Sequence, residues 1–143
     1  MTSIYLFDLD GTLALIEQRR HLVENGAKKW DEFYAACVDD QPNGPVIAIA
    51  RMLAEKHLVH ILSGRSKAVE PQTLAWLNRP GVPYVTLKMR EVGDFTPDEQ
   101  LKRNWLGMFN RTKIAGVFDD RDKVCKMWRE EGLTCFQVAP GAF

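Results

Sequence analysis

Two aspartates in the stretch FDLDGT stand one residue apart, directly after the apolar run Ile4–Phe7. Side chains alternate between the two faces of a strand, so Asp8 and Asp10 point the same way and Leu9 points the other way. Two carboxylates that converge on one place must share a proton, bind a cation or face solvent, because an uncompensated buried charge is costly. This pair is therefore the first candidate for chemistry.

A second acidic pair, Asp119 and Asp120, follows the apolar run Ile114–Phe118. If the two runs are neighbouring parallel strands, their carboxyl ends bring the two pairs together. Mg²⁺ prefers such oxygen ligands, together with water and substrate phosphate. We therefore predict a Mg²⁺ site formed by Asp8, Asp10, Asp119 and Asp120. An isolated Asp-x-Asp is more often a capping or solvated pair, so the prediction depends on both clusters.

A phosphate-binding group follows a third apolar run, Leu58–Leu62. Ser63 and the backbone N–H groups at Gly64 are suited to bind phosphoryl oxygens, and Arg65 can add a bidentate contact. A plain N-cap turn is the alternative interpretation of this Ser-Gly-Arg sequence.

A carboxylate nucleophile approaches a phosphate dianion only when cations offset the repulsion, so a lysine is needed beside it. Lys102 and Lys88 are the candidates. Lys102 lies four residues after Asp98 in a predicted helix, and Asp98 could hold it in place. The alternative is a surface i,i+4 ion pair, and Lys88 could simply face solvent. No nucleophile elbow and no phosphate-binding GxxxxGK[ST] loop occurs, which argues against P-loop kinase activity.

The elements that position these residues alternate between strands and helices. The predicted strands are Ile4–Phe7, Leu58–Leu62, Tyr84–Met89, Ile114–Phe118 and Leu133–Val138, and the predicted helices are Pro45–Lys56, Pro71–Asn78, one that begins at Thr96, and Lys123–Glu131. This alternation predicts a doubly wound, Rossmann-like α/β fold with a parallel five-stranded sheet. Ligands of such sheets bind beyond the carboxyl ends of the strands, where the acidic pairs and the Ser-Gly-Arg group fall.

The helix that carries Lys102 has the most specific start signal. Thr96-Pro97-Asp98-Glu99 combines an N-cap residue, a proline and a glutamate, the pattern of a capping box with Thr96 as N-cap. Leu101, Trp105 and Met108 are predicted to form its apolar face.

Residues 1–143 are expected to form one domain by length. Residues 13–41 do not fit the strand–helix alternation, and Trp30–Val38 within them has a helical pattern. We interpret this segment as a short helical flap inserted after the first strand. A short flap leaves the site open, which favours a polynucleotide end over an enclosed small metabolite.

Composition narrows the function classes. The 19 basic residues balance the 19 acidic ones, so no global charge attracts nucleic acid or a membrane. No stretch approaches the roughly 18 apolar residues of a membrane span, and no signal peptide is evident. Cys37, Cys125 and Cys135 have no zinc-like spacing and are expected to be free thiols. We expect a cytoplasmic protein.

The order of motifs, DLDGT, LSGR, a helical lysine and DD, resembles the haloacid dehalogenase-like hydrolase superfamily. The resemblance implies that Asp8 is the nucleophile and that Asp10 is the general acid and base. It also implies that Ser63 binds phosphate and that Lys102 stabilises the intermediate. The second acidic pair would complete the Mg²⁺ site.

Two longer stretches, GDFTPDEQLKRNW and FDDRDKVCKMWREEGLTCFQVAPGAF, are similar to the 3′-phosphatase domain of phage polynucleotide kinase. This similarity implies substrate roles for Arg65 and Asp98. It also implies such a role for an arginine eleven residues after the nucleophile, which is Arg19, next to Arg20. The chain contains no kinase domain, and KKWDEFYAACVDDQPNGP is its own version of the flap.

The leading hypothesis is a Mg²⁺-dependent phosphomonoesterase that removes 3′-phosphates from DNA or RNA ends through an aspartyl-phosphate, alongside a separate kinase or ligase. A nucleotidase or a general small-molecule phosphatase is the nearest alternative. A non-catalytic module that binds nucleic-acid ends or a repair partner is the alternative from another class. Four clustered carboxylates argue against it, because they do not help a protein bind a polyanion. The sequence indicates neither the oligomeric state nor a preference for DNA or RNA.

Overall fold

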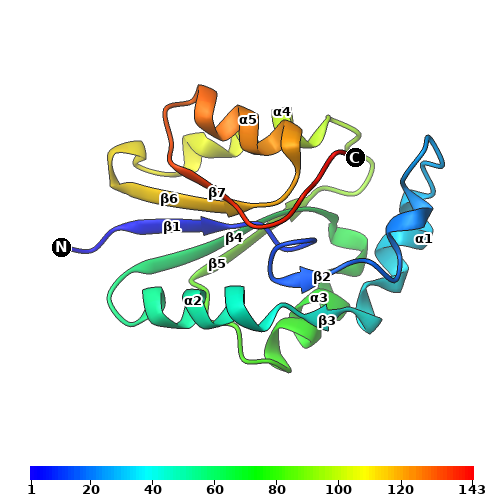
Figure 1. Ribbon diagram of the computed structural model, residues 1–143, viewed down its shortest axis with the longest axis horizontal. Coiled ribbons are helices and arrows are strands. Elements are labelled where there is room, and N and C mark those ends of the chain that lie inside the picture. The colour runs from blue at the N-terminus through cyan, green and yellow to red at the C-terminus, as the bar shows by residue number, and fades with distance from the viewer.

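The computed structural model describes residues 1–143 and contains a five-stranded parallel sheet (Figure 1). The strand order is β5-β4-β1-β6-β7. The strands are β1 (Ile4–Phe7), β4 (Leu58–Ser66), β5 (Thr86–Arg90), β6 (Ile114–Asp119) and β7 (Cys135–Gln137). The chain moves outward from β1 through β4 and β5, then returns to the other side of β1 through β6 and β7. This reversal of direction places a ligand crevice at the carboxyl ends of the central strands.

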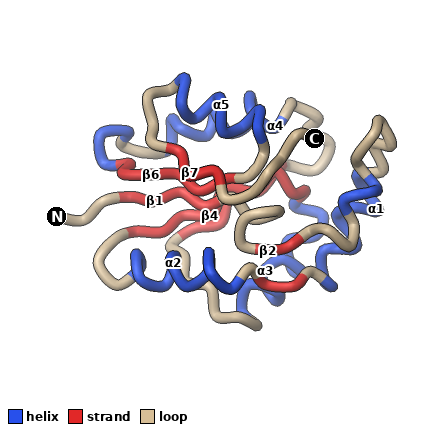
Figure 2. The backbone as a smooth tube through the Cα atoms, in the orientation of Figure 1, coloured by secondary structure: helices blue, strands red, loops and turns tan.

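Helices cover both faces of the sheet, as predicted for a doubly wound fold (Figure 2). These are α2 (Gly44–Ala54), α3 (Glu70–Asn78), α4 (Asp98–Trp105) and α5 (Asp122–Glu130), whereas α1 (Trp30–Ala35) lies beyond the end of the sheet. In the view of Figures 1 and 2, α4 and α5 lie above the sheet, and α2 and α3 lie below it. None of these helices is long and apolar enough to cross a bilayer.

The central strand β1 joins two hydrophobic cores because its side chains alternate between the faces of the sheet. Phe7 packs into the core on the side of α2 and α3, whereas Ile4 and Leu6 pack into the core on the side of α4 and α5. Each of these three side chains is at most 8% exposed. Because β1 is buried on both faces, the position of the next residue, Asp8, at the carboxyl end of the strand is fixed.

The segment 13–41 forms a small substructure beside the carboxyl edge of the sheet. Its two ends are joined where β2 (Ala14–Leu15) pairs antiparallel with β3 (Gln41–Pro42). Between them lies α1, followed by a 3₁₀ turn at Ala36–Asp39. Ile16, Val23 and Phe33 form a separate buried cluster within it.

The capping box predicted at Thr96 is wrong. Helix α4 begins at Asp98, and the Thr96 hydroxyl donates to Asp94 Oδ1 at 2.6 Å. Pro97 has extended backbone angles (φ −53°, ψ 143°), and no side chain caps the helix. The Thr96 hydroxyl and backbone N–H both donate to the Asp94 carboxylate, so Thr96 belongs to the loop before the helix and does not accept from an N–H of its first turn.

The far end of the same helix also differs from the prediction. Met108 is 51% exposed, whereas Leu101 and Trp105 are buried as expected. The α-helix ends at Trp105 and a 3₁₀ turn, Leu106–Met108, follows. The change in helical period rotates Met108 away from the core.

Candidate active site

Asp8 lies at the point where β1 leaves the sheet and is 7% exposed. Its carboxylate accepts hydrogen bonds from Lys102 Nζ at Oδ1 (2.7 Å) and from the Thr12 hydroxyl at Oδ2 (3.1 Å). Its backbone N–H donates to the carbonyl oxygen of Phe118 on β6 at 2.9 Å. The side chain is therefore fixed from three elements at the floor of the crevice.

Gly11 makes the turn after Asp8 and Asp10 feasible. Its φ is +82°, and a Cβ at this position would lie 1.9 Å from Asp120 Oδ2. Any other residue would strain the backbone and displace the Asp120 carboxylate. The glycine of the DLDGT motif thus lets the Asp120 carboxylate pack against the turn that follows Asp8.

Lys102 reaches the acidic residues from α4, and its side chain is only 1% exposed. Its Nζ lies 2.7 Å from Asp8 Oδ1 and 3.2 Å from Asp119 Oδ2. Asp98 Oδ2 is more distant, at 3.9 Å. Burial lowers the pKa of Lys102, but the carboxylates of Asp119 and Asp8 outweigh burial and raise it well above its usual range. The lysine is a buried cation, and the surface-pair interpretation is wrong.

Asp8, Asp119 and Asp120 offer carboxylate oxygens that all lie within 4.8 Å of one another. Burial and the neighbouring Asp119 raise the pKa of Asp8, and the same two causes raise the pKa of Asp120 to about 7. Three carboxylates therefore face one ammonium group. This donor set, made only of hard oxygens with excess negative charge, fits a divalent cation such as Mg²⁺. The metal-binding roles of Asp8, Asp10, Asp119 and Asp120 stay predictions.

Asp10 lies outside this group, although it is only two residues from Asp8. Its Oδ1 accepts hydrogen bonds from Arg19 Nη2 at 2.6 Å and from Arg65 Nη2. Burial would raise the pKa of Asp10, but the guanidinium groups of Arg65 and Arg19 outweigh it and hold the pKa well below its usual range. In this arrangement Asp10 is an ionised carboxylate, and its lowered pKa makes it a weak base. Donation of a proton requires that these contacts loosen.

Arg19 is fully buried and does not line the crevice. Besides Asp10, it contacts Asp40 and the carbonyl oxygen of Phe33. The neighbouring Arg20 instead pairs with Glu24. Of the two arginines considered from the sequence, Arg19 reaches the acidic residues. Its substrate contact stays a prediction.

The Ser-Gly-Arg group lies at the end of β4, within a strand that extends further than predicted. Ser63 Oγ accepts the backbone N–H of Arg65 at 3.1 Å, and Ser63 is 1% exposed. Gly64 lines the crevice, and a Cβ there would lie 2.1 Å from Asp98 Oδ1. Glycine is therefore required at this position so that Asp98 can approach the strand. The substrate roles of Ser63, Gly64 and Arg65 are untested by this geometry.

Asp98 lies between two arginines that the sequence analysis missed. Its carboxylate oxygens are 3.7 Å from Arg90 Nη2 and 3.7 Å from Arg121 Nη1. The buried Oδ1 has no hydrogen-bond partner, and Asp98 is among the residues that line the crevice. Arg90 is itself fixed by the carbonyl oxygens of Gly64 (2.8 Å from Nε) and Thr96 (2.6 Å from Nη1). Only their positions at the ends of β5 and β6 could have indicated these arginines.

The crevice has a volume of about 620 Å³ and contains Asp8, Asp10, Asp119 and Asp120 in its lining. Aromatic side chains from three separate segments also line it, among them Phe143 at the C-terminal end. Trp30, Phe33 and Tyr34 come from α1, and Phe95 comes from the loop between β5 and α4. Phe95 is 92% exposed.

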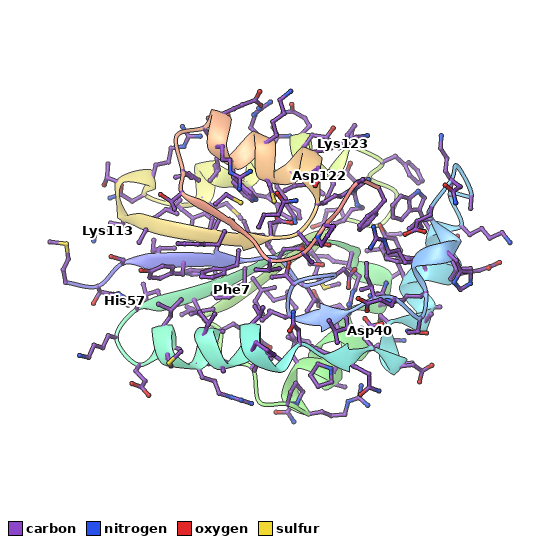
Figure 3. The ribbon with its side chains drawn as sticks, viewed as in Figure 1. Phe7, Asp40, His57, Lys113, Asp122 and Lys123 are labelled. Atoms are coloured by element: carbon purple, nitrogen blue, oxygen red, sulfur yellow. The ribbon has the colours of Figure 1, made fainter.

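Figure 3 shows the two ends of the sheet through labelled side chains. Asp122, Lys123 and Asp40 lie toward the end of the molecule that contains the flap, whereas His57 and Lys113 lie toward the opposite end. Because Lys123 lines the crevice and Asp122 begins α5 directly after β6, the crevice opens at the carboxyl ends of the strands. The crevice thus lies at the edge of the sheet where the sequence places the site, and its role as the active site stays a prediction.

Comparison with known proteins gives the family. The sequence model of the polynucleotide kinase PNKP phosphatase domain matches residues 2–143. A protein of Autographa californica nuclear polyhedrosis virus, named as a bifunctional polynucleotide kinase/RNA ligase, is 31% identical over 139 residues. The match covers 93% of this chain and 19% of the viral protein. The chain thus spans about a fifth of the length of this curated relative.

Solved structures agree with this assignment. A chain of the Pnkp1/Rnl/Hen1 complex matches with a TM-score of 0.83 and 31% identity, over 99% of this chain and 48% of that one. A phosphatase structure from Clostridium difficile has a TM-score of 0.68 at 14% identity, over 95% of this chain and 84% of that one.

A haloacid dehalogenase family enzyme from Bacteroides thetaiotaomicron, solved with magnesium and inorganic phosphate, has a TM-score of 0.56 at 14% identity. The match covers 96% of this chain and 94% of that chain. The likeness to the last two structures concerns the fold, and it confirms the haloacid dehalogenase-like α/β architecture. The chain belongs to the family of polynucleotide kinase PNKP phosphatase domains, and it is a phosphatase of the haloacid dehalogenase type.

Proposed function

We propose that this protein is a Mg²⁺-dependent phosphomonoesterase that removes 3′-phosphates from polynucleotide ends through an aspartyl-phosphate on Asp8. The observation that carries the proposal is the contact of 2.7 Å between the Asp8 carboxylate and the buried Lys102, beside two further carboxylates. A nucleophilic carboxylate needs a fixed cation to approach phosphate, and this arrangement supplies one.

In the first step the Asp8 carboxylate forms a bond to phosphorus while the bond from phosphorus to the sugar oxygen breaks. Lys102 offsets the negative charge of Asp8 and of the phosphoryl group. Mg²⁺, held by Asp8, Asp119 and Asp120, would act as a Lewis acid toward the phosphoryl oxygens. Asp10 is ionised in this structure, so it first takes up a proton from solvent once the substrate loosens its contacts with the two arginines. It then gives that proton to the departing sugar oxygen.

In the second step water attacks the phosphorus of the aspartyl-phosphate, and its proton passes to Asp10. Inorganic phosphate leaves and the Asp8 carboxylate is restored. The strongly acidic character of Asp10 beside Arg65 and Arg19 favours its ionised form at the start of this step. Proton transfer by one carboxylate in both directions completes the cycle without a net change in the protein.

Phosphoryl oxygens not bound by metal are assigned to the Ser63–Arg65 segment. The buried Nε of Arg65 has no hydrogen-bond partner in the protein, so it retains a donor for substrate. The hydroxyl hydrogen of Ser63 is also unengaged, since its oxygen acts only as an acceptor for the N–H of Arg65. Ser63 is buried and does not line the crevice, so its contact with phosphate requires that the substrate uncover it.

A nucleotide end as substrate is supported by the dimensions and chemistry of the crevice. A cavity of about 620 Å³ is large for a phosphate alone, and ligand pockets of this size hold whole organic groups. The exposed Phe95 at its rim offers a surface on which a base can stack. The relative from the virus is named as a kinase and ligase for polynucleotides. We further propose that the chain acts with a separate kinase or ligase.

A substrate panel with and without Mg²⁺ tests the proposal. A 3′-phosphorylated oligonucleotide, its 5′-phosphorylated isomer, and nucleoside 3′- and 5′-monophosphates are compared at equal concentration. We expect Mg²⁺-dependent release of phosphate, with the highest kcat/KM for the 3′-phosphorylated oligonucleotide. A clear preference for the mononucleotides would instead support a nucleotidase. Absence of turnover with every ester would leave only the binding module.

A further inference from the structure

The buried position of Arg19 limits how this residue can contribute to the reaction. It is 0% exposed and does not line the crevice, so it has no surface on which to meet a substrate in this conformation. Its guanidinium nevertheless reaches the Asp10 carboxylate, with Nη2 at 2.6 Å from Oδ1. Any contribution of Arg19 to the reaction therefore passes through Asp10.

Asp40 determines the direction of this contact. Asp40 Oδ1 accepts from Arg19 Nε at 2.8 Å, and Asp40 Oδ2 accepts from Arg19 Nη2 at 2.6 Å. The guanidinium group is planar, so two parallel hydrogen bonds at Nε and Nη2 fix the direction of the remaining N–H on Nη2. That remaining N–H is the one directed at Asp10.

Other contacts fix the plane of the same guanidinium. The carbonyl oxygen of Phe33 accepts from Arg19 Nη1 at 3.0 Å, and the ring of Phe33 lies 4.1 Å from Arg19 Cζ. The Asp40 side chain is fully buried and lies 3.7 Å from Arg65 Nη2, the second cation on Asp10. Two carboxylates and two guanidinium groups thus form a closed, charge-balanced set.

The backbone of Asp40 is anchored independently of its carboxylate. The indole Nε1 of Trp76, on α3, donates to the Asp40 carbonyl oxygen at 2.8 Å, and the Asp40 N–H donates to the Cys37 carbonyl oxygen at 3.2 Å. A substitution of the side chain therefore leaves these two contacts in place and removes the bidentate contact with Arg19.

We propose that Asp40 is a positioning residue for the reaction: its carboxylate holds Arg19, and through Arg19 it holds the carboxylate of Asp10 toward the departing sugar oxygen. Asp40 lies near the C-terminal end of the flap segment, directly before β3. Its contact with Arg19 therefore couples the flap to the acid–base step. The proposal rests on the role of Asp10 stated under the proposed function.

The test compares two leaving groups. A sugar alcohol needs a proton as it departs, whereas p-nitrophenolate departs without one, so kcat/KM for p-nitrophenyl phosphate does not depend on proton donation in the phosphoryl-transfer step. We expect Asp40→Asn to lower kcat/KM for the 3′-phosphorylated oligonucleotide by about 10²-fold, because displacement by about an ångström has effects of this size. The same variant is expected to change kcat/KM for p-nitrophenyl phosphate by less than about threefold.

Two further variants serve as references. Asp39→Ala changes the same residue type at the exposed neighbouring position and is expected to behave as wild type with both substrates. Asp10→Asn is expected to reproduce the selective loss. Because removal of Asp40 leaves a buried arginine short of acceptors, the double variant Asp40→Leu/Arg19→Met, which leaves neither charge, is measured as well. It is expected to show the same selective loss, with the thermal midpoint recorded for each protein.

The outcomes separate the inference from the proposed function. A selective loss in both Asp10→Asn and Asp40→Asn supports the positioning role. A selective loss in Asp10→Asn alone, or an equal loss with both substrates in Asp40→Asn, overturns the role of Asp40 and leaves the proposed function intact. No selective loss in Asp10→Asn contradicts the acid–base role of Asp10 itself.

Discussion

The two aspartates of the DLD motif lie in opposite electrostatic surroundings, although one residue separates them. Around Asp8, three carboxylates face one ammonium, and the pKa of Asp8 is raised by burial and by Asp119. Around Asp10, two carboxylates face two guanidinium groups, and arginine contacts overcome burial and lower its pKa. The two carboxylates of one motif therefore have different partners: other carboxylates and an ammonium group for Asp8, and two guanidinium groups for Asp10.

The difference arises from the elements that supply each partner. We call Asp8, Asp119, Asp120 and Lys102 the acidic cluster, and Asp10, Asp40, Arg19 and Arg65 the balanced cluster. The acidic cluster is built by the core of the fold: Lys102 comes from α4 and Asp119 ends β6. The balanced cluster draws on the flap, since Arg19 and Asp40 lie near the two ends of the segment 13–41. We infer that the geometry of the sheet serves the nucleophile and the metal, whereas the flap serves proton transfer and substrate choice.

The largest expected effect is that of Asp8→Asn. An amide is a poor nucleophile, so kcat for every phosphate ester should fall on the order of 10⁴-fold or more. Steady-state phosphate release measures it, with a thermal melt to show that the variant is folded. Activity within tenfold of wild type would remove Asp8 from the role of nucleophile.

Removal of the one cation in the acidic cluster comes next. Lys102→Met should lower kcat by about 10²- to 10³-fold, because a buried charge at the reacting group is lost. The matched control is Lys126→Met on the exposed side of α5, which should leave kcat unchanged. Equal activities for the two variants would show that Lys102 is structural only.

The acidic cluster should also make the metal-free protein sensitive to pH. Asp120 has a pKa raised to about 7, from 3.8. The folded protein therefore holds a proton that the unfolded chain releases, and the free energy of unfolding should fall as the pH rises from about 4 to about 7.

Mg²⁺ competes with that proton, so its stabilising effect should increase over the same pH range. Thermal midpoints measured with EDTA and with Mg²⁺ check this, and Asp120→Asn should flatten the slope. Asp10 has a lowered pKa, so its contribution to stability is lost only below this range, as the pH falls through its folded pKa. A midpoint that rises toward neutral pH without metal would contradict the account of the acidic cluster.

The smallest effect is expected outside both clusters. Phe95→Ala should raise KM for the 3′-phosphorylated oligonucleotide by about tenfold, since stacking of one base contributes about 1–3 kcal/mol. It should leave kcat/KM for p-nitrophenyl phosphate unchanged. Met52→Ala removes another exposed apolar side chain, 62% exposed on α2, and is the control. A change in kcat instead of KM would place Phe95 in the chemistry.

The sequence predicted the sheet and the approach of the acidic pairs because both depend on local patterns. Apolar runs end at Asp8 and Asp119, and parallel strands bring such ends together. Spacing left Lys102 and Lys88 as candidates, and the resemblance to the haloacid dehalogenase-like hydrolases favoured Lys102. These elements agree with the observed bounds to within a few residues, as for β1, α2 and α3.

The balanced cluster was much harder to predict because its contacts join distant parts of the chain. Asp40 and Arg19 are 21 residues apart, and Arg65 lies 55 residues from Asp10. No spacing rule relates such pairs, and a polar residue in an irregular segment resembles a solvated one. The predicted cap at Thr96 failed for a related reason, since a nearby carboxylate outside the helix accepted its hydroxyl.

The central claim is that Asp8 carries the phosphoryl group. The most direct measurement is rapid acid quench of the enzyme with Mg²⁺ and the 3′-phosphorylated oligonucleotide, followed by peptide mass spectrometry. We predict one phosphoryl group on the peptide that contains Asp8, removed by hydroxylamine and absent from Asp8→Asn. Full turnover with no phosphorylated peptide at any quench time, or with the label on another residue, would contradict the account.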